Sequence, residues 1–420
     1  MASPPRYNPF KPGSIVDPAM FAGRAEELAT LERILFQTRN GNPEHFIIDG
    51  ERGIGKSSLL FYLRQLAAGE IPCSQETRHD FLTLFISLER SNSYTDIVMR
   101  IARELARVLA AKNPADELVK KIWDFIKRLE VMHVSLKGGA NVTPPEELLY
   151  ELSDSLRATL ERMAGLNGVL ILLDEADSPP ASSELGRLIK MLTERFVATG
   201  CKNVAIGLAG LTGVVARLSE SHESAPRLFR IIRLEPLTPE ERHNVIELGL
   251  KEALEKNQVE TKINPLAAKW ISDMSEGYPH FVQQFAYSAF DSDSDNMITV
   301  EDVALGSLGQ NGALRQLGVK YFSDLFFEKT LSNDYRTVLR AMAAHSADWV
   351  SRADLRNEAK VSATALNNAL TALKARHVIV PKPGSPGMYR LPFRSFATWI
   401  RLFTSAEESR AAPSTPGAGG

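Results

Sequence analysis

Apolar runs alternate with helix-periodic segments from Ala25 to Leu234. Uninterrupted apolar runs are typical of parallel strands that are buried on both faces. The predicted strands are Phe46–Ile48, Phe81–Leu88, the run from Gly168 that ends in Asp174-Glu175, Val204–Leu211 and Ile231–Leu234. The predicted helices, the first of which precedes the first strand, are Ala25–Arg39, a segment ending near Ala68, Tyr94–Ala111, Asp116–Glu130, Pro144–Met163 and Leu185–Thr199. This alternation predicts an α/β fold with a parallel sheet and helices on both faces.

The pattern changes after residue 236. Pro239–Ser307 has apolar residues at helical spacing throughout, which predicts an all-α lid. Further on, Asp334–His345, Ser351–Ala359 and Ser362–Arg376 read as helices, and Val378–Pro392 reads as two short strands around a Pro/Gly turn. Three helices followed by such a hairpin predict a winged helix. The expected domains are residues 1–236, including a Pro-rich N-terminal arm over residues 1–20, then 237–330, 331–404 and a disordered tail, 405–420.

One further local feature is the pair Gly138-Gly139. It lies within Val131–Thr143, for which we expect a small hairpin.

The turn after the first strand has the composition of a phosphate-binding loop. Residues 50–57 read GERGIGKS and match G-x-x-x-x-G-K-[ST]. Glycines let successive backbone N–H groups face inward around a phosphate, and the following helix adds its N-terminal partial charge. We expect Lys56 to reach the β/γ-phosphates and Ser57 to ligate Mg²⁺. The predicted nucleotide-binding residues of this loop are Gly50, Gly53, Ile54, Gly55, Lys56, Ser57 and Ser58.

A pair of acidic residues ends the third strand, where residues 168–177 read GVLILLDEAD. The carboxyl ends of parallel strands are where open α/β sheets bind ligands. Asp174 is expected to hold Mg²⁺, and Glu175 is placed to polarise a water for attack on the γ-phosphate. An Asp-Glu pair alone could be a solvated strand end, but next to a phosphate-binding loop it favours an ATPase. The expected cofactors are therefore ATP/ADP and Mg²⁺.

The charge is unevenly distributed although the chain of 420 residues has a net charge of only −2. Residues 333–403 contain eleven Lys/Arg and four Asp/Glu, which gives +7 there and −9 elsewhere. A basic segment of this kind favours a polyanion partner, and duplex DNA is the expected one. Candidate contacts on the third helix of this segment are Thr364, Asn367, Asn368 and Lys374, although such side chains are often merely solvated.

The cysteines and the apolar runs bear on the compartment. Cys73 and Cys201 have no metal-ligand spacing, so a reducing cytoplasm without a disulfide is expected. The run Val204–Ala216 falls short of the ~18 residues that a spanning helix needs, so no membrane partner is expected. The N-terminus has no charged segment followed by an apolar run, so no signal peptide is expected.

Taken in order, these features resemble the AAA+ superfamily of P-loop ATPases. The resemblance covers about residues 7–403 and rests on Phe21-Ala22-Gly23-Arg24 before the first helix, the loop at 50–57, the acidic strand end, a helical lid and a winged helix. It is greatest to the origin-recognition-like and STAND-like branches. It implies ATP binding, a nucleotide-dependent switch, and self-association or a protein partner.

Two further roles are implied by the resemblance. Sensor 1 is a polar residue after the strand that follows the Asp-Glu strand, which is Thr212 here; Thr212 could equally cap the helix after it. An arginine finger lies just before the last strand and acts on a neighbouring subunit. Arg227 is the candidate, with Arg230 as the alternative, because Arg230 and Arg233 fall at strand spacing. All three arginines could instead be solvated.

The lid departs from the standard pattern. Standard members carry a lid arginine where this chain has Gly277-Tyr278-Pro279-His280. The sequence looks like the Gly-x-Pro motif of STAND-type switches, which implies nucleotide contacts from Pro279 and His280. Pro279 could also simply start a helix. Without the lid arginine, slow hydrolysis is expected.

The sequence leaves two functions open. One is a DNA-associated ATPase switch of the initiator or transposition-regulator kind. The other is a STAND-like signalling or phage-defence switch, whose winged helix binds protein and holds an autoinhibited ADP state. A small-molecule phosphotransferase fits poorly, because it gives Glu175 and the lid no role.

Overall fold

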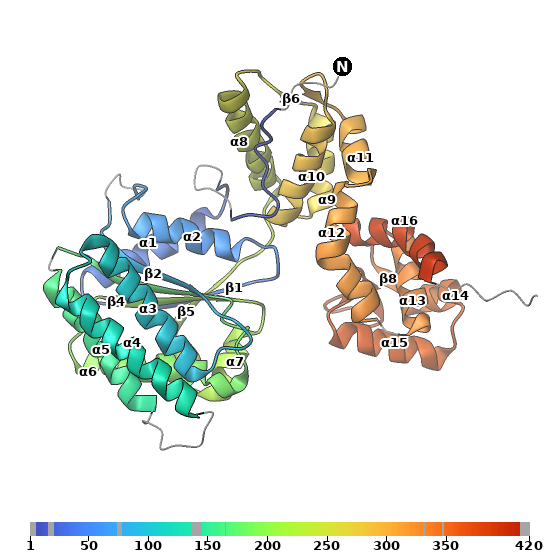
Figure 1. Ribbon diagram of the computed structural model, residues 1–420. Coiled ribbons are helices and arrows are strands. Elements are labelled where there is room, and N and C mark those ends of the chain that lie inside the picture. The colour runs from blue at the N-terminus through green and yellow to red at the C-terminus, as the bar shows by residue number, and fades with distance from the viewer. Residues whose placement is uncertain are drawn as a thin grey trace, which may run out of the picture. The chain divides into compact units, whose positions relative to one another are not determined.

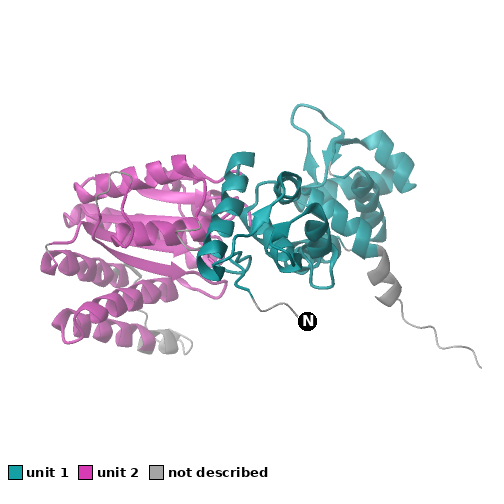
Figure 2. Ribbon diagram, turned by 90° about the horizontal axis from the view of Figure 1, so that it is seen from above, with its two compact units in different colours: residues 1–14, 236–420 teal, residues 15–235 magenta. Residues whose placement is uncertain are grey.

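The computed structural model describes residues 6–15, 21–73, 78–136, 145–163, 165–330, 332–346 and 348–411. These residues form two compact units, which Figure 2 distinguishes by colour. Residues 15–235 form the sheet unit, and residues up to 14 join residues 236–420 in the helical unit. The chain therefore passes between the units twice, after Ser14 and after Glu235.

The sheet unit is built on five parallel strands in the order β2-β3-β4-β1-β5. They are β1 (His45–Asp49), β2 (Phe81–Ser87), β3 (Gly168–Asp174), β4 (Val204–Gly210) and β5 (Phe229–Arg233). Every residue of β3 and β4 is buried, as the uninterrupted apolar runs predict. Asp49 is in register with Gly210 on one side and with Arg233 on the other. The carboxyl ends of β4, β1 and β5 therefore lie side by side.

Helices cover both faces of this sheet, so the predicted α/β class is confirmed. Figure 1 shows α1 and α2 along one face and α3 to α6 along the other. The helices are α1 (Ala25–Arg39), α2 (Lys56–Ala67), α3 (Tyr94–Lys112), α4 (Glu117–Leu136), α5 (Pro145–Arg162), α6 (Leu185–Ala198) and α7 (Val214–Ser221).

The expected hairpin over Val131–Thr143 is wrong in its first half. Helix α4 continues to Leu136. Buried residues such as Ile122, Ile126 and Leu129 give the preceding turns of this helix an apolar stripe, and the backbone continues the helix beyond them. The rest of the expected hairpin lies outside the described residues.

The lid is mostly helical, as predicted. It contains α8 (Pro239–Asn257), α9 (Pro265–Ser275), α10 (Pro279–Ser292), α11 (Val300–Leu308) and α12 (Ala313–Leu317), followed by the π-helical turns η4 (Gly318–Phe322) and η5 (Asp324–Glu328). The expectation that Pro239–Ser307 is all helical is wrong at two short segments. Strands β6 (Lys262–Ile263) and β7 (Met297–Ile298) pair in parallel and join the starts of α9 and α11. Two-residue strands are too short to produce a pattern in the sequence.

The N-terminal arm packs on the lid helices α8 and α10. Phe10 is only 2% exposed, and a Cβ at Gly249 would lie 2.3 Å from its ring, so the glycine makes room for the phenylalanine. Arg6 forms an ion pair with the buried carboxylate of Asp293 at 2.7 Å, and Tyr7 donates from its backbone to Asn257 at 2.8 Å. From its sequence the arm is expected in the domain of residues 1–236, whereas residues 6–14 group with the helical unit through these contacts.

The C-terminal part has the predicted three helices: α13 (Asn333–Ala344), α14 (Arg352–Ala359) and α15 (Ala363–Ala375). A small antiparallel sheet in the order β8-β10-β9 accompanies them, with β8 (Val350–Ser351), β9 (Val380–Pro381) and β10 (Met388–Arg390).

The tail expected from residue 405 is wrong for its first seven residues, because α16 spans Arg394–Ala411. Its first half buries Phe396, Trp399 and Ile400, and this apolar stripe anchors the helix. Residues 412–420 lie outside the described part. Among the helices of the described part, none is both long enough and apolar enough to cross a membrane.

Candidate functional site

The turn between β1 and α2 has the backbone geometry of an anion cradle. Gly53 and Gly55 have φ angles of 81° and 99°, in the left-handed region that favours glycine. A Cβ at Gly50 would lie 2.9 Å from the Ile54 side chain, which is itself buried. Helix α2 begins at Lys56 with no acidic residue in its first turn. The loop therefore presents a helix N-terminus, with Ser57 and Ser58 in its first turn, to whatever it binds.

Lys56 lies over this loop. Its ammonium group donates to the carbonyl oxygens of Gly50 and Glu51, both at 2.8 Å. Burial lowers the pKa of Lys56, while the carboxylates of Asp177, Asp174, Asp49 and Glu51 oppose that shift. A phosphate oxygen offers the ammonium the same kind of acceptor with a full charge, so the desolvated cation is suited to an anionic ligand.

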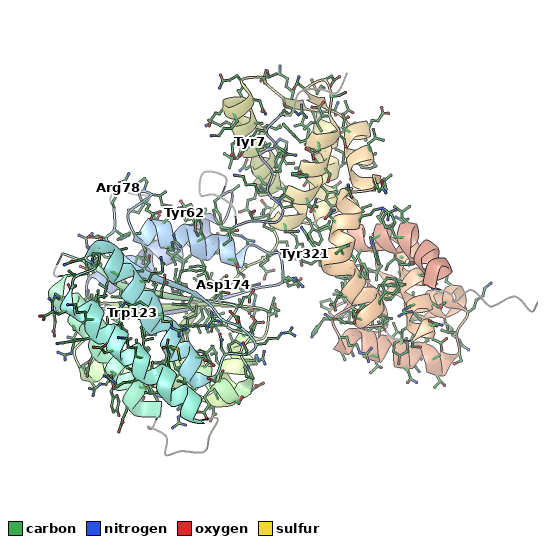
Figure 3. All side chains as sticks on the ribbon, in the orientation of Figure 1. Tyr7, Tyr62, Arg78, Trp123, Asp174 and Tyr321 are labelled. Atoms are coloured by element: carbon green, nitrogen blue, oxygen red, sulfur yellow. The ribbon has the colours of Figure 1, made fainter. Side chains whose placement is uncertain are left out.

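Asp174, which Figure 3 labels, is the last residue of the buried strand β3, and Glu175 follows it. Asp174 is 7% exposed, and its Oδ1 accepts from the backbone N–H of Glu175 at 2.9 Å. Glu175 has a φ of 54°, which is uncommon for a residue with a side chain and is found often at functional sites. Its side chain is exposed. Burial of part of the carboxyl group raises the pKa of Glu175, and the charges of Asp174 and Asp177 add to the shift. A raised pKa suits a general base.

The donor set fits a magnesium ion that is shared with phosphates. The described residues contain no group of three or more His, Cys, Asp or Glu that could hold a metal on their own. Mg²⁺ in nucleotide sites usually takes one or two protein oxygens and completes its shell with water and phosphate. Ser57 and Asp174 are the residues that would hold it.

The structure adds three residues around the loop that were not predicted from the sequence. Asp49 is 3% exposed at the end of β1, and its Oδ2 lies 3.6 Å from Nε of Arg233. Arg24 is 6% exposed and donates to the carbonyl oxygen of Ile54 at 3.1 Å. Asp177 accepts from the backbone N–H of Leu211 at 2.8 Å. Arg24 and Asp177 fall within motifs that the sequence reveals, whereas Asp49 has no sequence signal except an acid directly before the loop.

Thr212 lies in the exposed turn after β4, at the same edge of the sheet as the loop. The N-cap of α7 is Gly213, and no side chain caps that helix in the described structure, so the capping alternative for Thr212 is not realised.

The three arginines near β5 differ in their surroundings. Arg230 pairs with Glu44 at 3.2 Å and Arg233 pairs with Asp49. Arg227 lies exposed in the short helix η3 (Ala225–Leu228), and the interactions described for the sheet unit include no ion pair of its side chain. Arg227 therefore stays the candidate for a contact in trans.

Pro279 and His280 occupy the first turn of α10 in the helical unit. Their described neighbours are aromatic: the His280 ring lies 5.3 Å from the Tyr321 ring. The structure thus confirms that Pro279 starts a helix. The expectation that it also contacts a nucleotide stays a prediction.

The C-terminal part exposes the polar residues that the sequence singled out. Thr364, Asn367, Asn368 and Lys374 lie on one exposed face of α15. On the small sheet, Lys382 and Arg390 lie over the Trp349 ring at 5.7 and 5.0 Å from its centroid. Arg376 instead donates to the carbonyl oxygen of Lys329, so it has a structural role.

The chain is similar to known proteins both in sequence and in structure. Residues 20–198 match the family model described as an AAA ATPase domain. The ORC2 protein of Aeropyrum pernix, in ADPNP-ADP complexes, superposes with a TM-score of 0.54 at 14% identity and covers 96% of this chain and 99% of its own. Cdc6p from Pyrobaculum aerophilum gives 0.47 at 15% identity, covering 96% and 98%. The comparison with curated proteins gives no match.

Proposed function

We propose that this chain, whose residues 20–198 match the family model of an AAA ATPase domain, is a slowly hydrolysing, ATP-dependent switch of the initiator or transposition-regulator kind that associates with duplex DNA. The observation that carries the proposal is the glycine loop with the half-buried Lys56 over it and with Asp174 buried at the end of β3. The solved ORC2 protein with the same fold was studied with ADPNP and ADP, which supports the choice of nucleotide.

Each residue at the loop has a defined task in this proposal. The N–H groups of the loop and Lys56 would bind the β/γ-phosphates, and Ser57 and Asp174 would hold Mg²⁺, which would neutralise phosphate charge. Glu175 accepts a proton from the attacking water. Two hydrogen bonds fix the left-handed backbone of Glu175. The N–H of Ala176 donates to the carbonyl oxygen of Ala209, and the N–H of Ser178 donates to the carbonyl oxygen of Glu175, both at 2.8 Å. Thr212 lies at the same sheet edge and orients the water or the γ-phosphate.

Slow turnover follows from the lid sequence. A cation over the γ-phosphate stabilises charge in the transition state, and the lid offers Pro279 and His280 in place of an arginine. A switch that stays in its ATP state for a long time has time to act on a partner.

The basic C-terminal part supports the DNA assignment. Its net charge of +7 is an electrostatic footprint for phosphates, and the exposed face of α15 adds groups that can donate to phosphates or base edges. The small antiparallel sheet beside α15 is the wing of the proposed winged helix, with Lys382 and Arg390 as its cations.

Replacing Arg227 by Ala should reduce hydrolysis without weakening ATP binding, because a finger acts across an interface on charge that develops in the transition state. A loss of 10³-fold or more is the usual size of such an effect. Mixing Arg227→Ala with Lys56→Ala protein should restore part of the activity, because one mixed interface joins an intact site to an intact finger. The matched control is Arg230→Ala, which removes a paired arginine. No recovery in verified mixed oligomers would mean that Arg227 does not act on the nucleotide site of a neighbouring subunit.

Reversing Lys374 and Lys382 to Glu should weaken binding to duplex DNA of any sequence, because these side chains neutralise phosphates. The logarithmic salt dependence of the affinity should become shallower by about 0.9 for each phosphate that is no longer neutralised. Fluorescence anisotropy over a salt series measures both effects. Arg376 is left intact because its side chain bonds to Lys329.

The control for this charge reversal is Lys120→Glu with Lys121→Glu, which makes the same charge change on the exposed face of α4. Equal weakening in both pairs would mean that net charge alone sets the affinity and that the C-terminal part is not the contact surface.

A further inference from the structure

The turn Glu276–Tyr278, between α9 and α10, is fixed to the segment where the chain enters the helical unit. Leu237 donates its backbone N–H to the carbonyl oxygen of Gly277 at 2.8 Å. Gly277 has a φ of 87°, and a Cβ there would lie 2.6 Å from the carbonyl oxygen of Leu237. Only a glycine allows this close approach, so movement of the entry segment must displace the turn.

Glu276 connects the same turn to helix α16. Its carboxylate accepts a hydrogen bond from the backbone N–H of Arg394, the first residue of α16. This acceptor satisfies one of the free N–H groups at the start of that helix, and its negative charge is favourable at a helix N-terminus.

The positive charges of three arginines act on the Glu276 carboxylate: Arg390 of β10, Arg394 of α16 and Arg242 of α8. Burial raises the pKa of Glu276, and these positive charges offset only part of that shift. The carboxylate is thus a charged junction between a lid helix, the small sheet and the C-terminal helix.

Aromatic packing makes the second connection. The Tyr278 ring is 7% exposed and meets the Phe393 ring edge-on, with centroids 4.9 Å apart. Phe281, two residues after Pro279, lies 5.3 Å from Phe393 and 5.2 Å from Tyr321, which Figure 3 labels. The residues on both sides of Pro279 therefore pack directly against the start of α16 and against η4.

We propose that the turn Glu276–Tyr278 is the coupling element that carries a change at Pro279 and His280 to the basic C-terminal part. The inference rests on the proposed function, in which the C-terminal part binds DNA, and on the predicted nucleotide contacts of Pro279 and His280. A displacement of the turn moves the N-terminus of α16 through Glu276 and Phe393. It also shifts Arg390, which lies over Trp349 on the proposed wing. Glu276 is a positioning residue in this scheme, since it contacts neither ligand.

Hydrogen exchange on the full chain tests the coupling. In the absence of nucleotide, Glu276→Ala should speed exchange in peptides covering residues 393–404 by about tenfold, the size expected when one hydrogen bond to a charged acceptor is removed. Glu276→Gln keeps an acceptor oxygen and should give a smaller increase. The matched control is Glu260→Ala, which removes an exposed lid carboxylate paired with Lys262 at 3.3 Å.

Adding ADPNP–Mg²⁺ then tests whether a change caused by the nucleotide passes through the turn to the start of α16. Binding should change exchange at residues 277–282 and at residues 393–404 in the wild type. In Glu276→Ala the second response should disappear, while ADPNP affinity changes less than about twofold. Transmission through the turn is refuted if the response at 393–404 persists in this variant. It is also refuted if the wild type responds only at 277–282. A wild type that does not bind ADPNP would overturn the proposed function, while the nucleotide-free comparison would still decide whether Glu276 fixes α16.

Discussion

Lys56→Ala is expected to lower the affinity for ATP–Mg²⁺ by roughly 10²-fold or more, which would place it below detection by isothermal titration. The substitution removes an ammonium group that lies over the loop and donates to its carbonyl oxygens. Hydrogen bonds from a charged group contribute about 1.5–3 kcal/mol each, and Lys56 is placed to make two of them to phosphates.

Lys120→Ala is the control for this experiment, since it removes an exposed lysine of the same unit. It should bind ATP as the wild type does. Micromolar affinity retained in Lys56→Ala would mean that the nucleotide binds somewhere other than the Gly50–Ser57 loop.

Glu175→Gln is expected to bind ATP normally and to lower its turnover by at least ~10²-fold, the usual contribution of a general base. Glutamine has the same shape but accepts no proton, so the left-handed backbone and the exposed position stay as they are. Single-turnover hydrolysis with excess enzyme measures the chemical step apart from product release. The variant should also accumulate any ATP-dependent oligomer.

The chain offers a close control for this substitution. Glu184 is also a glutamate with a positive φ, 50°, and its side chain is 44% exposed, but it pairs with Arg187 at 3.0 Å. Glu184→Gln should hydrolyse ATP at the wild-type rate. Wild-type turnover in Glu175→Gln would assign water activation to another group, and Asp177 would be the next to test.

The sheet and its loop could be predicted because their physical requirements are local. A strand buried on both faces needs an uninterrupted apolar run, and a backbone that cradles phosphate needs glycines at fixed positions. Both requirements are visible in single stretches such as 46–57 and 168–175. For the same reason, periodicity predicts the order of strands and helices along the chain in the sheet unit.

Errors in the fold prediction arose where tertiary packing overrides local composition. The segment from Ser405 has a polar, small-residue composition, yet α16 extends through it because the helix is anchored by Phe396 and Trp399 upstream. The turns at 131–136 continue a helix that already has a buried stripe. The strands β6 and β7 exist only because two distant segments meet.

The site, like the fold, could be predicted from the sequence only where its requirements are local. Motif residues such as Lys56 and Glu175 are identified by spacing, because the chemistry fixes their positions relative to the loop or strand end. Asp49 and Arg233 come together only because β1 and β5 are neighbours in register, and nothing in the sequence sets that pairing. The contacts of Glu276 with α16 likewise join residues more than a hundred positions apart.

The central claim is that a nucleotide bound at Gly50–Ser57 controls DNA association, and the affinity for labelled duplex DNA at low salt tests it most directly. Anisotropy titrations would compare the protein with ADPNP–Mg²⁺, with ADP–Mg²⁺ and without nucleotide. We predict a difference of about fivefold or more between the ADPNP and ADP states, the lower end of typical coupling between sites. Lys56→Ala should bind DNA with one affinity in all three conditions. Absence of DNA binding by the wild type in every state would contradict the account and would favour a STAND-like switch whose basic C-terminal part meets protein instead.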